Sequence, residues 1–244
     1  MPGLEVLERY PYGARSLAGV YVGDLLRAEV PALASATGNV DIVAIARRPG
    51  VLSKVAIRAR PGTVAPIVLG LGADHVARVR ERLDGERIHI VAWQRSPSGF
   101  IADALGLGEV PPMLLLPGIS HARALLGEID LRGIAGWRGL NVLLASALTG
   151  WRIRLEPVAA TPAWRRLQAA MLARRPVFGT VVGRAERGVR VEVLGLYAVL
   201  SGAGHEHRPN EEIEMRITRM DADEGRIFVS DRLPTTGQLG LPLA

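Results

Sequence analysis

The chain has 244 residues, of which 48% are apolar and 22% are charged, so it can form one large domain or two to three small ones and is not wholly disordered. Aromatic residues make up only 5%, and the absence of cysteine excludes a disulfide framework, a thiolate zinc site and a cysteine nucleophile. The N-terminus lacks a signal-peptide pattern, and no uninterrupted apolar run of about 18 residues occurs. We therefore expect a cytoplasmic protein without a membrane segment.

The charge is positive and unevenly distributed. The net charge is +6, and every basic residue is arginine except Lys54. Residues 39–95 contain ten basic and five acidic residues, and residues 151–175 contain six basic and one acidic, so each segment carries +5. Clustered arginine is typical of a protein that binds a polyanion, although a solvated basic surface is the alternative.

The first half of the chain predicts helices and strands in alternation. A helix-compatible run extends from Leu17 to Leu33. Alternating apolar residues predict strands over 40–48, 53–60 and 87–93, and helical spacing predicts a helix over 75–83. This gives the order helix, strand, strand, helix, strand.

The same order recurs about 65 residues later, which indicates an internal repeat. We predict a helix over 98–106, a strand over 112–117, a weaker strand over 121–129, a helix over 140–150 and a strand over 151–155. The most similar parts of the two copies are residues 69–90 and 135–155, where a glycine-bearing turn precedes a helix and a basic strand.

The pattern changes after the second copy. Residues 157–175 form a proline-bounded connector with a short basic helix. Five short alternating runs then predict the strands of a small barrel: 177–185, 188–195, 196–201, 211–220 and 225–230.

The clearest local motif is Gly136-Trp137-Arg138-Gly139, directly before a predicted helix. Glycines let a backbone approach a ligand closely, and a helix N-terminus presents unpaired N–H groups to an anion. Such a turn suits a sugar-phosphate backbone. A Walker loop is excluded because Lys54 lies in a strand, and a dinucleotide fingerprint fails because His75 replaces its third glycine.

Four segments resemble the tandem KH domains of NusA-type transcription factors. They are VDIVAIARRPGVLSKVAIRAR (40–60), GERIHIVAW (85–93), FIADALG (100–106) and GWRGLNVLLASALTGWRIRL (136–155). The resemblance covers about residues 20–156, and residues 176–232 are similar to an S1-type OB-fold barrel. It implies an α+β protein with two type II KH domains followed by a small five-stranded OB-fold (S1-like) barrel.

The domains implied by this resemblance follow one another along the chain. They are an N-terminal segment (1–16), a first KH domain (17–96), a second KH domain (97–156), a basic linker helix (157–175), the barrel (176–233) and a tail (234–244). NusA-type factors place the barrel before the KH pair, whereas here it follows.

The resemblance also implies that each KH domain holds about four nucleotides of single-stranded RNA at its GxxG turn. In the first domain that turn is Gly70-Leu71-Gly72-Ala73, where alanine replaces the last glycine and no residue is basic. The residues that we expect to bind RNA are Gly136, Trp137, Arg138, Gly139, Asn141, Gly70, Leu71, Gly72, Ala73, Arg47, Lys54, Arg58, Arg152, Arg154, Arg187, Arg190 and Tyr197.

We therefore expect an RNA-binding protein that acts on nascent RNA as a transcription elongation, termination or antitermination factor, with RNA polymerase or the ribosome as a possible partner. Two alternatives remain: an RNA- or ribosome-associated chaperone without polymerase contact, and a degenerate KH scaffold that binds protein. No catalytic motif or cofactor site is indicated, and the imidazoles of His205 and His207 lack a third metal ligand. We expect the acidic barrel either to contact protein or to bind RNA weakly. The oligomeric state is not indicated.

Overall fold

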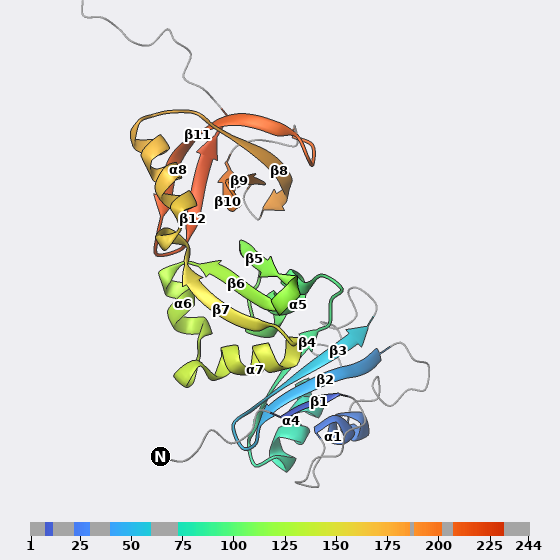
Figure 1. The fold of residues 1–244 in the computed structure, drawn as a ribbon. Coiled ribbons are helices and arrows are strands. Elements are labelled where there is room, and N and C mark those ends of the chain that lie inside the picture. The colour runs from blue at the N-terminus through green and yellow to red at the C-terminus, as the bar shows by residue number, and fades with distance from the viewer. Residues whose placement is uncertain are drawn as a thin grey trace, which may run out of the picture. The chain divides into compact units, whose positions relative to one another are not determined.

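The computed structural model describes residues 8–11, 22–29, 40–59, 73–185, 188–201 and 207–231. The chain divides into two compact units (Figure 1). Unit 1 comprises residues 1–123 and 134–154, and unit 2 comprises residues 124–133 and 155–244. The strands β6 and β7 each begin in unit 1 and end in unit 2.

Unit 1 contains a four-stranded sheet of order β1-β2-β3-β4. Its strands are β1 (Glu8–Pro11), β2 (Val40–Arg48), β3 (Leu52–Ala59) and β4 (Arg87–Ala92). The pairs β1–β2 and β2–β3 are antiparallel, and β3–β4 is parallel. Sequence periodicity predicts β2, β3 and β4 but not β1, because a four-residue strand at a sheet edge has no periodicity of its own.

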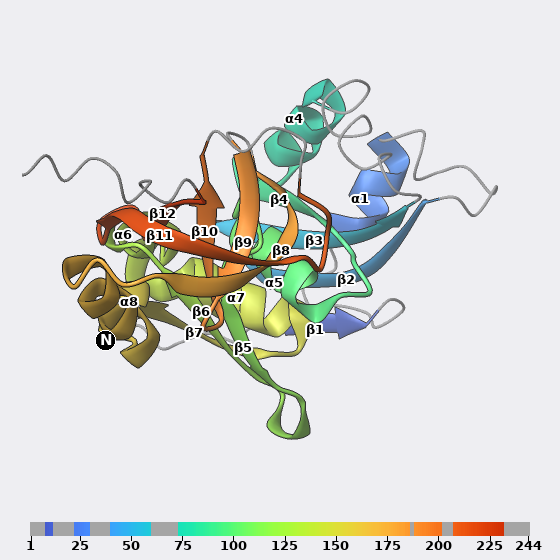
Figure 2. The ribbon, with the colours of Figure 1, turned by 90° about the horizontal axis from the view of Figure 1, so that it is seen from above.

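Helices cover both faces of this sheet. The helices α1 (Val22–Glu29) and α4 (Ala73–Arg82) pack on one face, where Leu26 and Val79 join Val55 and Ile57 of β3 in a buried core. The helix α7 (Leu140–Thr149) contacts β2 and β3 from the other face (Figures 1 and 2). Because both faces are covered, β3 is buried from Ser53 to Ile57.

A second, three-stranded sheet has the order β5-β6-β7. The elements from its first helix onward are α5 (Pro97–Leu105), β5 (Met113–Leu116), η1 (Pro117–Ile119), β6 (His121–Leu126), α6 (Glu128–Ile134), η2 (Trp137–Gly139), α7 and β7 (Arg152–Pro157). The sequence predicts α5, β5, α7 and β7. It places a strand over 121–129, but β6 ends at Leu126 and Gly127 separates it from α6.

The barrel of unit 2 is closed, with the strand order β10-β12-β11-β8-β9. Its strands are β8 (Val177–Ala185), β9 (Gly188–Val193), β10 (Leu196–Leu200), β11 (Glu212–Asp221) and β12 (Arg226–Ser230). The β10–β12 pair is parallel and the other pairs with given registers are antiparallel. This confirms a five-stranded barrel and is consistent with an OB-like fold.

The connector before the barrel is part of the barrel's core. It contains η3 (Val158–Ala160) and α8 (Pro162–Leu172). Thr161 caps α8 by accepting from the Trp164 N–H, and Trp164 and Leu167 pack among the buried barrel residues. This helix is therefore anchored by its apolar face rather than solvated all round.

Unit 2 also contains a close backbone contact between two glycines. A Cβ built on Gly127 would lie 2.4 Å from the Glu224 carbonyl carbon, and one built on Gly225 would lie 2.7 Å from the Gly127 nitrogen. The Ile129 N–H donates to the Asp223 carbonyl oxygen at 3.0 Å. The segment between β6 and α6 thus packs directly on the β11–β12 turn, where no larger residue fits.

The helices in the described part of the chain are all too short or too polar to cross a membrane.

Candidate nucleic-acid interface

The motif Gly136-Trp137-Arg138-Gly139 forms the connection between α6 and α7, here called the GxxG turn. Gly136 has φ 68° and ψ −179°, a conformation open only to glycine, and Gly139 has φ 74°. The Gly139 N–H donates to the Gly136 carbonyl oxygen at 3.2 Å and closes the turn. The backbone therefore requires glycine at position 136 and favours it at position 139.

The turn leads into a helix N-terminus without a side-chain cap. Gly139 is the N-cap of α7 and has no side chain to cap it, and the Leu140 N–H donates to the Trp137 carbonyl oxygen. Arg138 has φ 51°, which is uncommon outside glycine, and its side chain is exposed. Uncapped N–H groups and the positive end of the helix dipole beside an arginine favour a bound anion.

Asn141 supports this turn from inside the fold. Its Nδ2 donates to the carbonyl oxygens of Leu105, at 2.9 Å, and Ile134, at 2.7 Å. Both amide hydrogens are thereby used, and its Cβ lies 3.1 Å from a Cβ built on Gly136. We therefore correct the sequence-based assignment: Asn141 positions the turn rather than presenting its amide to RNA.

Trp137 projects from the turn and is 61% exposed, between two guanidinium groups. The Arg138 Cζ lies 4.8 Å from the centroid of the indole ring, and the Arg48 Cζ lies 5.6 Å from it. Arg48 belongs to the β2–β3 hairpin and is not among the residues expected from the sequence. The signal that could have identified it is its position beside Arg47, since adjacent strand residues face opposite sides of a sheet.

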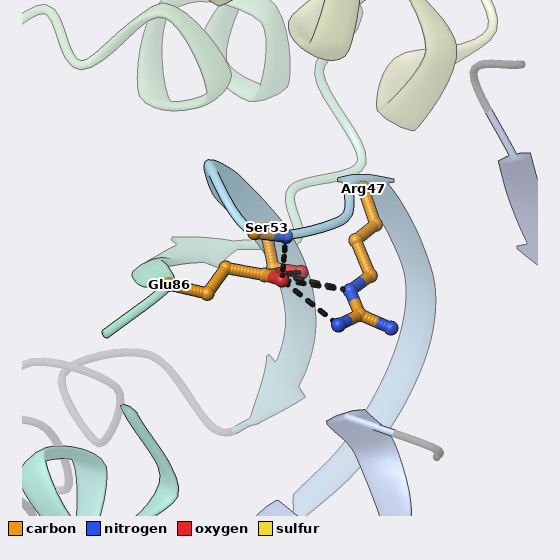
Figure 3. Close-up of polar contacts among 4 residues, drawn as sticks. Arg47, Ser53 and Glu86 are labelled. Atoms are coloured by element: carbon orange, nitrogen blue, oxygen red, sulfur yellow. Dashed lines mark hydrogen bonds and ion pairs between the residues drawn. The ribbon is translucent and has the colours of Figure 1, made fainter. Parts of the chain in front are cut away.

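Arg47 faces inward, contrary to expectation (Figure 3). Its Nη2 lies 2.8 Å from Glu86 Oε2, and the two side chains are 11% and 0% exposed. Glu86 also accepts from the Ser53 hydroxyl at 2.6 Å and from the Gly50 N–H at 2.8 Å. Burial opposes the charge on Glu86, but these hydrogen bonds outweigh it and lower the pKa of the carboxyl. Arg47 therefore anchors the hairpin and does not face a phosphate.

Lys54 is also buried, with 0% exposure. The prediction that it contacts phosphate is therefore corrected, because its side chain does not reach the surface. Its Nζ donates to the Ala104 carbonyl oxygen at 2.6 Å and to His89 Nδ1 at 2.9 Å. Burial lowers the pKa of Lys54 to about 8. Burial, and then the charge of Lys54, lower the pKa of His89 to about 4, so the imidazole is neutral and accepts the hydrogen bond.

Three other expected arginines are exposed. Arg58 pairs with Asp41 at 3.0 Å, and its Cζ lies 5.9 Å from the centroid of the Trp93 ring. Arg152 and Arg154 flank the buried Ile153 on β7 and point to its exposed side. These three side chains are exposed on the surface of unit 1.

The remaining expected residues lie elsewhere or beyond what the structure describes. Ala73 begins α4, whereas Gly70, Leu71 and Gly72 lie outside the described residues. On the barrel, the Arg190 Cζ lies 5.4 Å from the centroid of the Tyr197 ring, and Arg187 lies outside the described residues.

The candidate metal pair is also incomplete, because His205 lies outside the described residues. His207 contacts two carboxylates: Nδ1 lies 3.2 Å from Glu211 Oε1, and Nε2 lies 3.2 Å from Asp231 Oδ2. Hydrogen bonds with Asp231 and then Glu211 raise the pKa of His207. Both ring nitrogens are engaged within the barrel.

Comparison with known proteins gives one family match within unit 1. Residues 19–93 match the NusA-like first KH domain, a segment that includes β2, β3, α4 and β4. This supports the sequence-based resemblance for the first domain.

Matches to individual proteins extend further. The chain is 37% identical over 132 residues to the transcription termination/antitermination protein NusA of Thermus thermophilus, covering 54% of this chain and 34% of that protein. It is 33% identical over 95 residues to the NusA protein of Mycobacterium tuberculosis, covering 38% of this chain and 27% of that protein. The chain thus spans about a third or less of these curated relatives.

Among solved structures, the crystal structure of APE1850 aligns with 55% of this chain and 95% of its own, at 17% identity. The TM-score of 0.39 is too low to establish a common fold.

Proposed function

We propose that this protein binds single-stranded RNA and that its main contact is the GxxG turn at residues 136–139. The observation that carries the proposal is the combination of two positive-φ glycines, an uncapped α7 N-terminus and the exposed Arg138 in one short turn. Backbone N–H groups and arginine bind phosphate oxygens, and a KH turn holds about four nucleotides in this way.

The environment of the turn supports this proposal. Trp137 offers an exposed ring on which a base or sugar can stack, and Arg48 and Arg138 add positive charge on either side of it. Arg152 and Arg154 extend the exposed basic surface of unit 1 along β7. In contrast, Arg47 and Lys54 take no part in phosphate binding because protein groups already occupy them.

We further propose that residues 97–156 form a second KH domain. The order helix, strand, strand, helix, strand of α1, β2, β3, α4 and β4 recurs in α5, β5, β6, α7 and β7, with the short helix α6 added between β6 and α7. The match of 132 residues to the Thermus thermophilus protein is longer than one such domain, which also supports a pair. The intact GxxG motif in this second copy makes it the principal RNA site.

The biological role that we propose is that of an accessory factor in transcription elongation, termination or antitermination, non-catalytic and acting on nascent RNA. It is supported by the names of the partial relatives, and a cytoplasmic location stays a prediction. Affinity capture of the tagged chain after RNase treatment tests this role. Retained RNA polymerase subunits are expected, whereas ribosomal proteins alone would contradict it.

RNA binding is tested by adding a carboxylate to the turn. In Gly139→Asp the new Cβ meets no atom within 4 Å, and aspartate tolerates the left-handed backbone better than most residues. We expect at least a tenfold loss of affinity for a single-stranded RNA of about ten nucleotides, measured by fluorescence anisotropy, because the carboxylate repels phosphate.

The matched control is Gly195→Asp in the β9–β10 turn. Gly195 has φ 76° and equally open surroundings, so it undergoes the same change in charge and backbone strain away from the GxxG turn. Its affinity should stay within about twofold of the wild type. Equal affinities of the wild type and both variants would refute the proposed site.

A further inference from the structure

A cleft of about 490 Å³ lies in unit 1 at the end of α7 opposite the GxxG turn. Trp93 follows β4, and Trp151 lies two residues after the end of α7; both indoles line the cleft together with Phe100 of α5. We call this space the indole cleft. Among the residues that line the cleft, Arg95 alone is charged, and none belongs to the GxxG turn.

The lining provides flat apolar surfaces with a polar edge. Trp93 and Trp151 are only partly buried, so their rings remain accessible from the cleft. The uncharged polar residues of its wall are already bonded within the protein: the Thr149 hydroxyl donates to the Ala145 carbonyl oxygen at 2.8 Å, and Gln94 Nε2 donates to Asp103 Oδ2 at 2.9 Å. The accessible indole rings therefore carry the argument, because proteins stack single-stranded nucleobases on such rings.

Positive charge lies at the same cleft. Arg95 is exposed and contributes to the lining. The Arg58 Cζ lies 5.9 Å from the centroid of the Trp93 ring, and its ion pair with Asp41 is solvent-exposed and therefore weak. Cations beside an aromatic ring favour a nucleotide, which carries a phosphate, over an aromatic side chain of a protein.

Each end of α7 thus has an accessible indole ring with arginine side chains close to it. Trp137 with Arg48 and Arg138 lies at the start of the helix, and the indole cleft with Arg58 lies at its end. A ten-residue helix is about 15 Å long, so the two places lie within the span of one short RNA strand.

We propose that the indole cleft binds a nucleobase of the RNA strand whose backbone is held by the GxxG turn. This inference rests on the proposed RNA-binding function. It adds a second contact point, formed by the C-terminal end of α7 and by the segment that joins β4 to α5.

The test compares two RNA lengths on the full chain. An oligouridine of four nucleotides matches the GxxG turn alone, and one of about ten nucleotides reaches the cleft. We expect Trp93→Leu and Trp151→Leu each to weaken binding of the long RNA at least about fivefold and to leave the short RNA unchanged, since one stacked base is lost. Trp137→Leu at the turn should weaken both.

The two RNA lengths distinguish failure of the proposed function from failure of the nucleobase site. If the wild type binds neither RNA, the proposed function itself fails. If the wild type binds both and the leucine variants bind the long RNA equally well, the function stands and the nucleobase site is refuted, which leaves the cleft to a protein ligand.

A second measurement on the unaltered protein avoids any dependence on variant folding. A ten-nucleotide RNA carrying 5-iodouridine is crosslinked by light, and the crosslinked peptides are identified by mass spectrometry. Crosslinks at Trp93 or Trp151 in addition to Trp137 are expected. Crosslinks at Trp137 alone, with every position of the RNA labelled in turn, would overturn the proposal.

Discussion

Lys54 and His89 form a buried polar pair whose protonation states depend on each other. The ammonium donates to the imidazole and to the Ala104 carbonyl oxygen of α5. The pair therefore joins the sheet to that helix as long as His89 stays neutral, because a protonated imidazole cannot accept from Lys54. A second proton on this pair would place two positive charges 2.9 Å apart.

This arrangement predicts that acid destabilises unit 1. The pKa of His89 is about 4 in the folded chain and about 6.5 when unfolded, so the unfolded state binds more protons between these values. The free energy of unfolding should therefore fall as the pH falls from about 6.5 to 4, by up to roughly 3 kcal/mol from this residue. Urea unfolding of the wild type and of His89→Gln measures it, because the variant lacks this titration.

The difference between the two proteins should shrink with falling pH, and a constant difference would contradict the assignment. His207 has the opposite effect on how stability depends on pH, because its pKa is raised in the folded chain. The stability that it contributes is complete below about 6.5 and is lost as the pH rises through the raised folded pKa.

The opposite orientations of the Arg47 and Arg48 side chains illustrate what a sequence can predict about single residues. Strand alternation indicates that one of the two faces inward. It does not say which, because a register shift between Ile42 and Ala44 moves every later residue of β2 by one position. The partner Glu86 is distant in sequence, so no local pattern reveals that Arg47 is engaged.

Among the elements, the β2–β3 hairpin matters most for the site, because it carries Arg48 to Trp137. Glu86 holds this hairpin through Arg47, Gly50 and Ser53. The charge of Glu86 thus acts on the proposed RNA surface indirectly, by fixing the position of the hairpin tip.

We predict that Glu86→Gln lowers the free energy of unfolding by about 3–5 kcal/mol, because it leaves the guanidinium of Arg47 buried without its counter-ion. Asp41→Asn is the control, since it breaks the exposed pair with Arg58 and should cost less than about 1 kcal/mol. Chemical denaturation followed by circular dichroism measures both. Similar losses in the two variants would argue against a structural role for the buried pair.

The sequence predicts the long periodic elements, but it does not predict the short elements β1 and α6. The helix α7 follows from its buried Leu140, Leu144 and Leu148, which recur every fourth residue. The seven residues of α6 are too few for such a pattern and include the exposed Ile129. The GxxG turn was also found from sequence, because its glycines reflect a local backbone requirement.

At the scale of the whole molecule, charge distinguishes two basic segments of the chain from the acidic barrel segment. Residues 176–244 contain ten acidic and eight basic residues, whereas residues 39–95 and 151–175 are strongly basic. Phosphate binding depends on this balance, so we assign RNA to the basic segments.

We predict that RNA changes the NMR amide shifts of residues 40–155 and leaves the barrel residues 176–233 unchanged. With about four to six phosphate contacts, the logarithm of the binding constant should fall with the logarithm of salt concentration at a slope of about −3 to −4. Shifts at Arg190 and Tyr197 would instead bring the barrel into the RNA site. A slope near zero would exclude binding through phosphates.

The burial of Lys54 has a practical consequence. It is the only lysine of the chain and lies in β3, one of the two inner strands of its sheet, with its side chain fully buried. An endoprotease that cuts after lysine consequently has a single cleavage point, and that point is reached only when the sheet opens. The rate of native-state digestion by such an enzyme therefore reads out the opening of this one sheet directly.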